Sequence, residues 1–298
     1  MATLYTRQDS NRRKTIMLMT GFLVLVIAIG YAVSWYFENI LFVIIAFAVA
    51  LIMNIGSYWF SDKIVLRMTG ARPVTAEEAP ELYNIVENLS ITAGLPMPKV
   101  YLIDDPSPNA FATGRNPEHA VVAATTGLVG MLDRSELEGV MAHELAHVGN
   151  RDMLVMTVAV VLAGFIAILS DMLARTLMFG GNRDRHPIFL VIGILGIILA
   201  PIAAYLMKAT ISQRREYLAD ASGALLTRYP EGLASALEKI TNTSRPMRRA
   251  SHATAHLFIS DPFGDKTQKR SFGQRINALF QTHPPAEERI RRLREMSY

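Results

Sequence analysis

The chemistry of this chain is concentrated in the pentapeptide His143-Glu144-Leu-Ala-His147. Residues four apart lie on one face of a helix, so both imidazoles can reach the same ion. Glu144 lies about 100° further round the helix, where its carboxylate can contact a water beside the ion without displacing a ligand. The pattern therefore predicts a zinc site in which His143 and His147 are candidate ligands and Glu144 lies within reach of a water on the metal.

Two histidines leave a zinc site short of a protein ligand, so another group must come from elsewhere in the chain. The tripeptide Val-Gly-Asn follows His147, which excludes the third histidine of the metzincin spacing. Further on, Glu216 and Asp220 lie four residues apart. Glu216 is the candidate third ligand, and Asp220 can hold the other ring nitrogen of a ligating histidine. Each motif has a plain alternative: histidines that only pack, and acids on a solvated helix face.

The composition limits which other chemistries are possible. The chain has 298 residues and no cysteine, which excludes disulfides, thiolate metal sites, iron–sulfur clusters and a cysteine nucleophile. Hydrophobic residues make up 51% of the chain and charged residues only 19%, which is typical of a membrane protein. The net charge of +4 is too small to indicate a nucleic-acid partner, and we predict none.

Four apolar segments are candidates to cross the membrane, because a helix of about 20 residues spans the hydrocarbon core. They comprise residues 16–37, 40–60, 153–170 and 187–207. Basic residues flank the first pair at both ends: Arg7, Arg12, Arg13, Lys14, Lys63, Arg67 and Arg72. The positive-inside rule therefore predicts that both flanks are cytoplasmic. For the second pair, a buried helix pair or an interfacial hairpin is the alternative.

We expect a mainly α-helical membrane protein with a small β-sheet, in which a membrane hairpin divides a cytoplasmic domain that carries the metal site. Residues 1–60 form the first hairpin, 153–207 the second, and 61–152 and 208–298 the two parts of the cytoplasmic domain. Both parts must lie on one side of the membrane to share a metal ion. His147 lies six residues before the second hairpin and Glu216 nine after it, which places the metal within roughly 10–15 Å of the cytoplasmic membrane face.

Periodicity, turn residues and capping signals predict the regular elements of the cytoplasmic domain. The expected helices cover 80–93, 134–148, 212–228, 231–241, 272–281 and 286–296. The expected strands cover 99–103, 109–113 and 119–123, with a turn at 114–117 between the last two. Asp133 and Glu136 form a predicted capping box. Residues 244–270 are expected to form a polar loop.

Other residues have possible roles around the metal. Asn109, Ala110, Phe111 and Ala112 are predicted to form an edge strand that pairs with an extended substrate, although a plain hairpin strand is the alternative. His283 is the first candidate for stabilising the oxyanion and Tyr217 the second; His283 could equally be an ordinary loop residue. Four histidines are expected on the surface or in loops: His119, His186, His252 and His256. Four arginines are expected on the solvated face of an amphipathic helix, with a lipid-binding patch as the alternative: Arg289, Arg291, Arg292 and Arg294.

Taken together, the motifs resemble the HtpX family of stress-linked bacterial membrane metalloproteases, gluzincins related to the CAAX prenyl endoproteases. The resemblance rests on His143–His147, two downstream hydrophobic segments, Glu216–Asp220 and Thr282–Arg289, and it covers nearly the whole chain, including Asn109–Ala112. It implies that His143, His147 and Glu216 bind one zinc ion per chain, that Glu144 is the base and that Asp220 supports the ligands.

The resemblance also implies a biological role, namely digestion of misfolded or damaged proteins of the bacterial cytoplasmic membrane. The expected partners are therefore unfolded membrane proteins and the lipid bilayer. Two alternatives remain: an adaptor or holdase that keeps zinc without hydrolysing peptides, and a processing protease with a single defined substrate. The sequence makes no prediction of oligomeric state.

Overall fold

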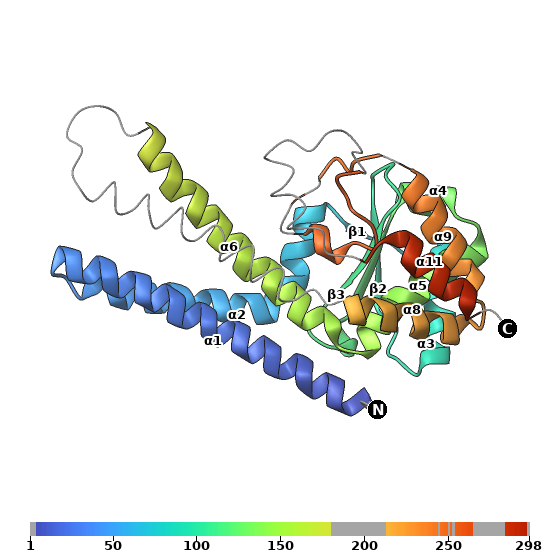
Figure 1. The fold of residues 1–298 in the computed structure, drawn as a ribbon, viewed down its shortest axis with the longest axis horizontal. Coiled ribbons are helices and arrows are strands. Elements are labelled where there is room, and N and C mark those ends of the chain that lie inside the picture. Colours follow the sequence, from blue (N-terminus) through green and yellow to red (C-terminus); the bar gives the residue numbers. More distant parts are fainter. Residues whose placement is uncertain are drawn as a thin grey trace.

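The protein combines long apolar helices with an α/β part that contains a small sheet (Figure 1). The structure, a computed structural model, describes residues 4–179, 213–243, 245–249, 251, 254–264 and 284–296. The predicted segment 187–207 and helix 272–281 lie outside the described residues, as do His186, His252 and His283. Within the described residues, the expected fold class, mainly α with a small sheet in a membrane protein, is confirmed.

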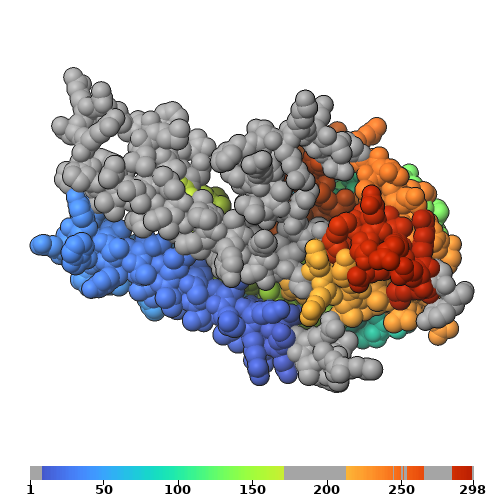
Figure 2. Space-filling view, viewed as in Figure 1, coloured from blue at the N-terminus to red at the C-terminus, as the bar shows by residue number. Residues whose placement is uncertain are grey.

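Among the described residues, three helices are long and apolar enough to cross a membrane: α1 (Leu4–Phe37), α2 (Leu41–Thr69) and α6 (Asp152–Phe179). Helices α1 and α2 form an antiparallel hairpin that extends away from the α/β part (Figures 1 and 2). In the most apolar stretch of α6, 67% of residues are buried by the protein itself, against 11% in α1 and 17% in α2. Helix α6 starts at the α/β part, where it contacts α5 and β3, and runs alongside both helices of the hairpin (Figure 1).

The sheet has four strands in the order β1-β2-β4-β3: β1 (Arg72–Pro73), β2 (Lys99–Ile103), β4 (Val121–Thr125) and β3 (Ala110–Thr113). Strands β2 and β4 are parallel, whereas β3 pairs with β4 as an antiparallel hairpin in the register Ala110↔Ala124. The predicted hairpin is thus present, but its second strand begins two residues late, because Pro117–His119 forms a 3-10 turn capped by Asn116. Strand β3 is an edge strand of the sheet.

Helices pack around the sheet to form the main core. They are α3 (Pro80–Ala93), α4 (Thr126–Met131), α5 (Arg134–Gly149), α8 (Gln213–Thr227), α9 (Pro230–Asn242) and α11 (Ala286–Glu295). Except for α4, each was predicted to within one residue at either end. Figure 2 shows α11 in red beside α8 and α9, with which it packs. Helix α5 contacts α3, α8, α9 and β3, so it lies at the centre of the α/β part.

The start of α5 is fixed by the predicted capping box. The Asp133 side chain accepts the backbone N–H of Glu136, and the Glu136 side chain accepts the backbone N–H of Asp133. These two bonds satisfy amide donors that the first turn of a helix leaves unpaired. At the other end Arg151 has a φ of 57°, and this turn redirects the chain from α5 into α6.

The segment predicted as a polar loop, residues 244–270, contributes to the core where it is described. It contains one 3-10 turn, Ala255–Leu257, followed by the buried residues Phe258 and Ile259. The Phe258 ring packs edge-on against Phe111 of β3, with ring centroids 5.2 Å apart. His256, which was expected on the surface or in a loop, lies in this segment but is buried, because the apolar residues that follow it pack into the interior.

Candidate metal centre

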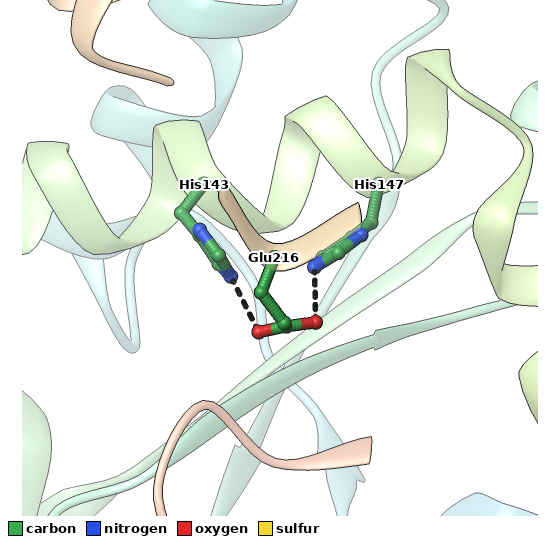
Figure 3. A group of neighbouring side chains, drawn as sticks. All are labelled: His143, His147 and Glu216. Carbon is green, nitrogen blue, oxygen red and sulfur yellow. Dashed lines mark ion pairs between the residues drawn. The ribbon is translucent and has the colours of Figure 1, made fainter. Parts of the chain in front are cut away.

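Two neighbouring helices bring His143, His147 and Glu216 together (Figure 3). The histidines lie one turn apart on α5, and Glu216 lies in the first turn of α8. His143 Nε2 is 3.9 Å from Glu216 Oε2, and His147 Nε2 is 3.6 Å from Glu216 Oε1. All three side chains are buried, and their nearest ligand atoms lie within 4.8 Å of one another. The sequence had paired these residues across an intervening hydrophobic segment, and the structure places them in one cluster.

Glycine allows α8 to lie against the backbone of α5 at the cluster. A Cβ at Gly223 would lie 2.9 Å from the backbone nitrogen of His143. This is closer than Cβ atoms approach backbone atoms in real structures. The absence of a side chain at Gly223 therefore sets the separation of the two helices and, with it, the distance from Glu216 to the histidines.

We expect Gly223→Ala to push α8 away from α5, since the added methyl meets rigid backbone. Overpacking of this kind destabilises a protein by about 1–3 kcal/mol, and metal affinity should fall because Glu216 moves with α8. Gly130→Ala is the matched control, because a Cβ there meets nothing within 4 Å. Thermal unfolding and metal titration of both variants test the prediction. Equal effects at the two glycines would contradict it.

Each histidine has a carboxylate on the ring nitrogen that faces away from Glu216. His143 Nδ1 is 2.9 Å from Asp220 Oδ1, and His147 Nδ1 is 3.3 Å from Asp152 Oδ2. A carboxylate at Nδ1 holds a proton on that atom and turns the Nε2 lone pair toward a metal. The structure thus places Asp220 where the sequence expected it. Asp152 was missed, although an acid as the first residue of an apolar segment, five residues after His147, was a usable signal.

Arg289 was also missed, because it was expected on a solvated face with its neighbours on α11. It is instead buried, and it donates from Nε to Asp220 Oδ2 at 2.9 Å and from Nη2 to Asp220 Oδ1 at 2.7 Å. The reason is its spacing: Arg289 and Leu293 lie one turn apart, on the face of α11 that packs inward. The other three arginines are exposed, as expected.

Burial and the surrounding charges set the protonation of the cluster. Burial raises the pKa of Glu144 to about 7, although the charge of His147 and an N–H donated by Ala112 lower it in part. Burial lowers the pKa of His147, but Asp152, Glu216 and Glu144 outweigh burial and raise that pKa to about 9. A carboxyl group with a pKa near neutrality can both take up and release a proton under physiological conditions.

Burial and nearby charges have a different effect on the pKa of His143 and on that of its partner Asp220. Burial lowers the pKa of His143, and the charges of Arg289 and His147 lower it further, so that it falls below its usual value although Asp220 acts to raise it. Burial alone would raise the pKa of Asp220, but Arg289 and His143 lower it to about 2. Asp220 is therefore a fixed anion at neutral pH, suited to hold a proton on His143 Nδ1.

The three side chains fit a divalent metal of the zinc type. Two ligands at ~2 Å from a tetrahedral ion are roughly 3.3 Å apart, close to the distances from Glu216 to the two histidines. Two imidazoles and a carboxylate form the donor set of catalytic zinc sites that keep a fourth position open. The acids on both Nδ1 atoms supply the outer hydrogen bonds that such ligands require.

The proposed substrate strand lies next to this cluster. The backbone N–H of Ala112 bonds to Glu144, which places β3 beside the candidate base. Further along β3, the carbonyl of Ala110 accepts the N–H of Ile259 at 3.0 Å, and the side chain of Asn109 bonds the backbone of Ser260 in both directions. Strand β3 is therefore already bonded within the protein at Ala112, to Glu144, and at Ala110, to Ile259, and an arriving strand would have to displace these contacts.

The two oxyanion candidates remain predictions. His283 lies outside the described residues. Tyr217 is half-buried on α8, and its ring lies under the guanidinium of Arg292, 3.9 Å from ring centroid to Cζ. The contact with Arg292 fixes the orientation of the Tyr217 ring.

Comparison with known proteins bears on this site. A family model described as Peptidase family M48 matches residues 76–297, which include the whole His–His–Glu cluster. The chain belongs to peptidase family M48. With its membrane-capable helices and a cluster able to hold a metal, this M48 peptidase is a membrane metalloprotease. The resemblance inferred from the motifs is confirmed.

Relatives of this M48 peptidase match it over almost its full length. A protease HtpX homolog of Caldanaerobacter subterraneus is 47% identical over 304 residues, covering 99% of this chain and 98% of the relative. A protease HtpX homolog of Pyrococcus abyssi is 50% identical over 287 residues, covering 95% of each chain. Among solved structures, that of S. mikatae Ste24p aligns with a TM-score of 0.49 at 19% identity, covering 96% of this chain and 66% of that one.

Proposed function

We propose that this M48 peptidase is a zinc-dependent endopeptidase of the bacterial cytoplasmic membrane whose active site lies on the cytoplasmic side. One observation carries the proposal: the Nε2 atoms of His143 and His147 converge on the Glu216 carboxylate, and Glu144 lies beside them with a pKa raised to about 7. In this proposal His143, His147 and Glu216 bind one zinc ion per chain. When bound, zinc supplies Lewis-acid chemistry, acidifying water and polarising a carbonyl group.

Glu144 moves the protons of the reaction. Its carboxylate takes a proton as water attacks the scissile carbonyl, and it then passes that proton to the leaving nitrogen. The raised pKa suits both steps, because the group must gain and lose the proton at the same pH. Asp220 and Asp152 keep protons on the outer nitrogens of His143 and His147, so neither imidazole rotates away from the ion.

The proposed orientation is supported by charge at the ends of the hairpin. The amino-terminal end of α1 contacts Asn150 and Asp152 beside the cluster, and the carboxyl-terminal end of α2 leads into β1. Basic residues lie at both of these ends: Arg12, Arg13, Lys14, Lys63 and Arg67. The positive-inside rule assigns such ends to the cytoplasm, so the metal cluster would face the cytoplasm close to the membrane.

We infer that the substrates are misfolded or damaged membrane proteins. A site next to the bilayer can accept chains that protrude from it, and an edge strand such as β3 binds mainly through backbone groups, which tolerates many sequences. A survey of cleavage sites separates this from a processing enzyme: many unrelated sites support quality control, and a single sequence contradicts it. A holdase that keeps zinc without hydrolysis would leave casein intact.

The metal assignment is tested through Glu216, the ligand most distant in sequence. We expect purified wild-type protein to retain zinc through dialysis against a weak chelator, and Glu216→Ala to lose both zinc and casein cleavage. Only two protein ligands would remain in the variant, and the histidines would lose the carboxylate that favours a cation. Glu238→Ala is the control, because this acid is exposed on α9. Full zinc retention by Glu216→Ala would overturn the assignment.

A further inference from the structure

The amino-terminal end of α1 reaches the metal cluster. Asn11 is only 6% exposed, although it lies at the start of a helix whose apolar stretch is largely uncovered by protein. Its side-chain amide donates to Asp152 Oδ1 at 2.8 Å and to the carbonyl of Asn150 at 3.2 Å. Asn150 follows α5, which carries the histidines, and Asp152 is the first residue of α6.

Asp152 joins Asn11 to a candidate metal ligand. One of its carboxylate oxygens, Oδ1, accepts the amide of Asn11, while the other, Oδ2, lies 3.3 Å from His147 Nδ1. The carboxylate is buried. Arg215 also approaches Oδ1, but its Nη1 is 3.9 Å away, beyond hydrogen-bond distance. Asn11 therefore makes the hydrogen bond that fixes the rotation of the Asp152 carboxylate.

The two histidines are supported in parallel ways from different parts of the protein. Asp220, behind His143, is held by Arg289 of α11, which belongs to the α/β part. Asp152, behind His147, is held by Asn11 of the membrane hairpin. Removing Asn11 would free one oxygen of a buried carboxylate, and the carboxylate could then turn away from His147. The His147 ring could then rotate, and its Nε2 lone pair would no longer be held toward the metal position.

We propose that Asn11 is a positioning residue for the metal site and that metal affinity depends on docking of α1 against the start of α6. The inference rests on the proposed role of His143, His147 and Glu216 as metal ligands. It assigns the membrane hairpin a part in building the active site in addition to anchoring the chain.

A matched control lies one turn along the same buried face of α1. Thr15 is also buried, but its hydroxyl bonds the carbonyl of Asn11 within the helix. Thr15→Val therefore removes a buried hydrogen bond and keeps the side-chain volume, without touching Asp152 or His147. A general loosening of α1 should affect both positions, whereas positioning of Asp152 should affect only Asn11.

The decisive measurement is the zinc dissociation constant of the full-length protein in detergent micelles, obtained by competition with a chelator. Loss of an outer partner of a metal ligand typically weakens affinity 10–100-fold, and we expect Asn11→Ala to weaken it by about 10-fold, since Asn11 acts through Asp152. Thr15→Val should stay within about twofold of wild type. Wild-type affinity in Asn11→Ala, or an equal loss in Thr15→Val, would overturn the inference.

Exchanging the side chains of Asn11 and Asp152 distinguishes a role of Asn11 in positioning the metal site from a role in folding alone. Asn11→Asp alone sets two carboxylates against each other and should weaken zinc binding more than Asn11→Ala. In Asn11→Asp combined with Asp152→Asn, the amide at position 152 can donate to the new carboxylate and accept from His147. The exchange should recover affinity relative to Asn11→Asp, and failure to do so counts against the inference. Wild-type protein that binds no zinc would instead contradict the proposed function.

Discussion

Glu144→Gln is expected to remove peptide hydrolysis while leaving zinc in place. Glutamine has nearly the same shape as glutamate, and its amide oxygen can still accept the N–H of Ala112. It cannot take up a proton from water at neutral pH, so the step assigned to Glu144 has no base. General-base catalysis contributes about 10²–10⁴-fold to a rate. We therefore expect a loss of that size in kcat for casein or for an unfolded membrane protein, with KM little changed.

The metal content decides how such a loss is interpreted. Glu144 is not among the side chains that converge on the metal position, so the variant should bind as much zinc as wild type. Glu138→Gln is a suitable control, because it makes the same change on α5 away from the cluster and should keep full activity. Equal cleavage by wild type and Glu144→Gln would exclude Glu144 as the base. Loss of zinc from the variant would show instead that Glu144 supports metal binding.

The parts of the site that were predictable from sequence are those fixed by local geometry. Spacing on one helix placed His143 and His147 together, and the capping box located the start of their helix at Asp133. Glu216 and Asp220 could be found because they lie one turn apart and because a zinc site needs a third ligand. In each case the relevant distance is set within a single helix or by the chemistry of the ion.

The residues that were missed depend on how distant elements pack. Asn11, Asp152 and Arg289 lie on three different helices. Asn11 belongs to the basic flank before the first apolar segment, Asp152 lies immediately before the third, and Arg289 was expected on a solvated face. Their roles follow from helix positions that no local pattern encodes. The buried stretch at Phe258 was missed for the same reason, since a few apolar residues in a polar segment do not reveal which strand they will cover.

The residues that support His143 also stabilise the fold. Asp220 is buried and holds a charge, so it needs Arg289 whether or not a metal is bound. Arg289 also approaches Glu216, with Nη1 3.9 Å from Oε2, and bonds the carbonyl of Ile259 at 3.3 Å. One side chain thus joins α11 to α8 and to the segment that covers β3.

We therefore expect Arg289→Met to destabilise the protein strongly, because it leaves the Asp220 carboxylate buried without its cation. Removing one partner of a buried ion pair typically costs about 3–5 kcal/mol. Arg291→Met is the control on the same helix: its pairs with Glu288 and Glu295 are exposed, and exposed pairs contribute little to stability. Thermal or denaturant unfolding in micelles measures both variants. A small effect of Arg289→Met would mean that water or another cation replaces the guanidinium.

A double variant then separates the two roles of Asp220. Replacing both members of a buried ion pair by apolar residues is often neutral or stabilising, so Arg289→Met combined with Asp220→Leu should recover much of the lost stability. Zinc affinity should not recover, because His143 Nδ1 still lacks its acceptor and nothing holds the imidazole toward Glu216. Recovery of stability and zinc affinity together would show that Asp220 serves only the fold. Recovery of stability alone would assign the Asp220 carboxylate to the metal site, and Arg289 to keeping that carboxylate charged and in place.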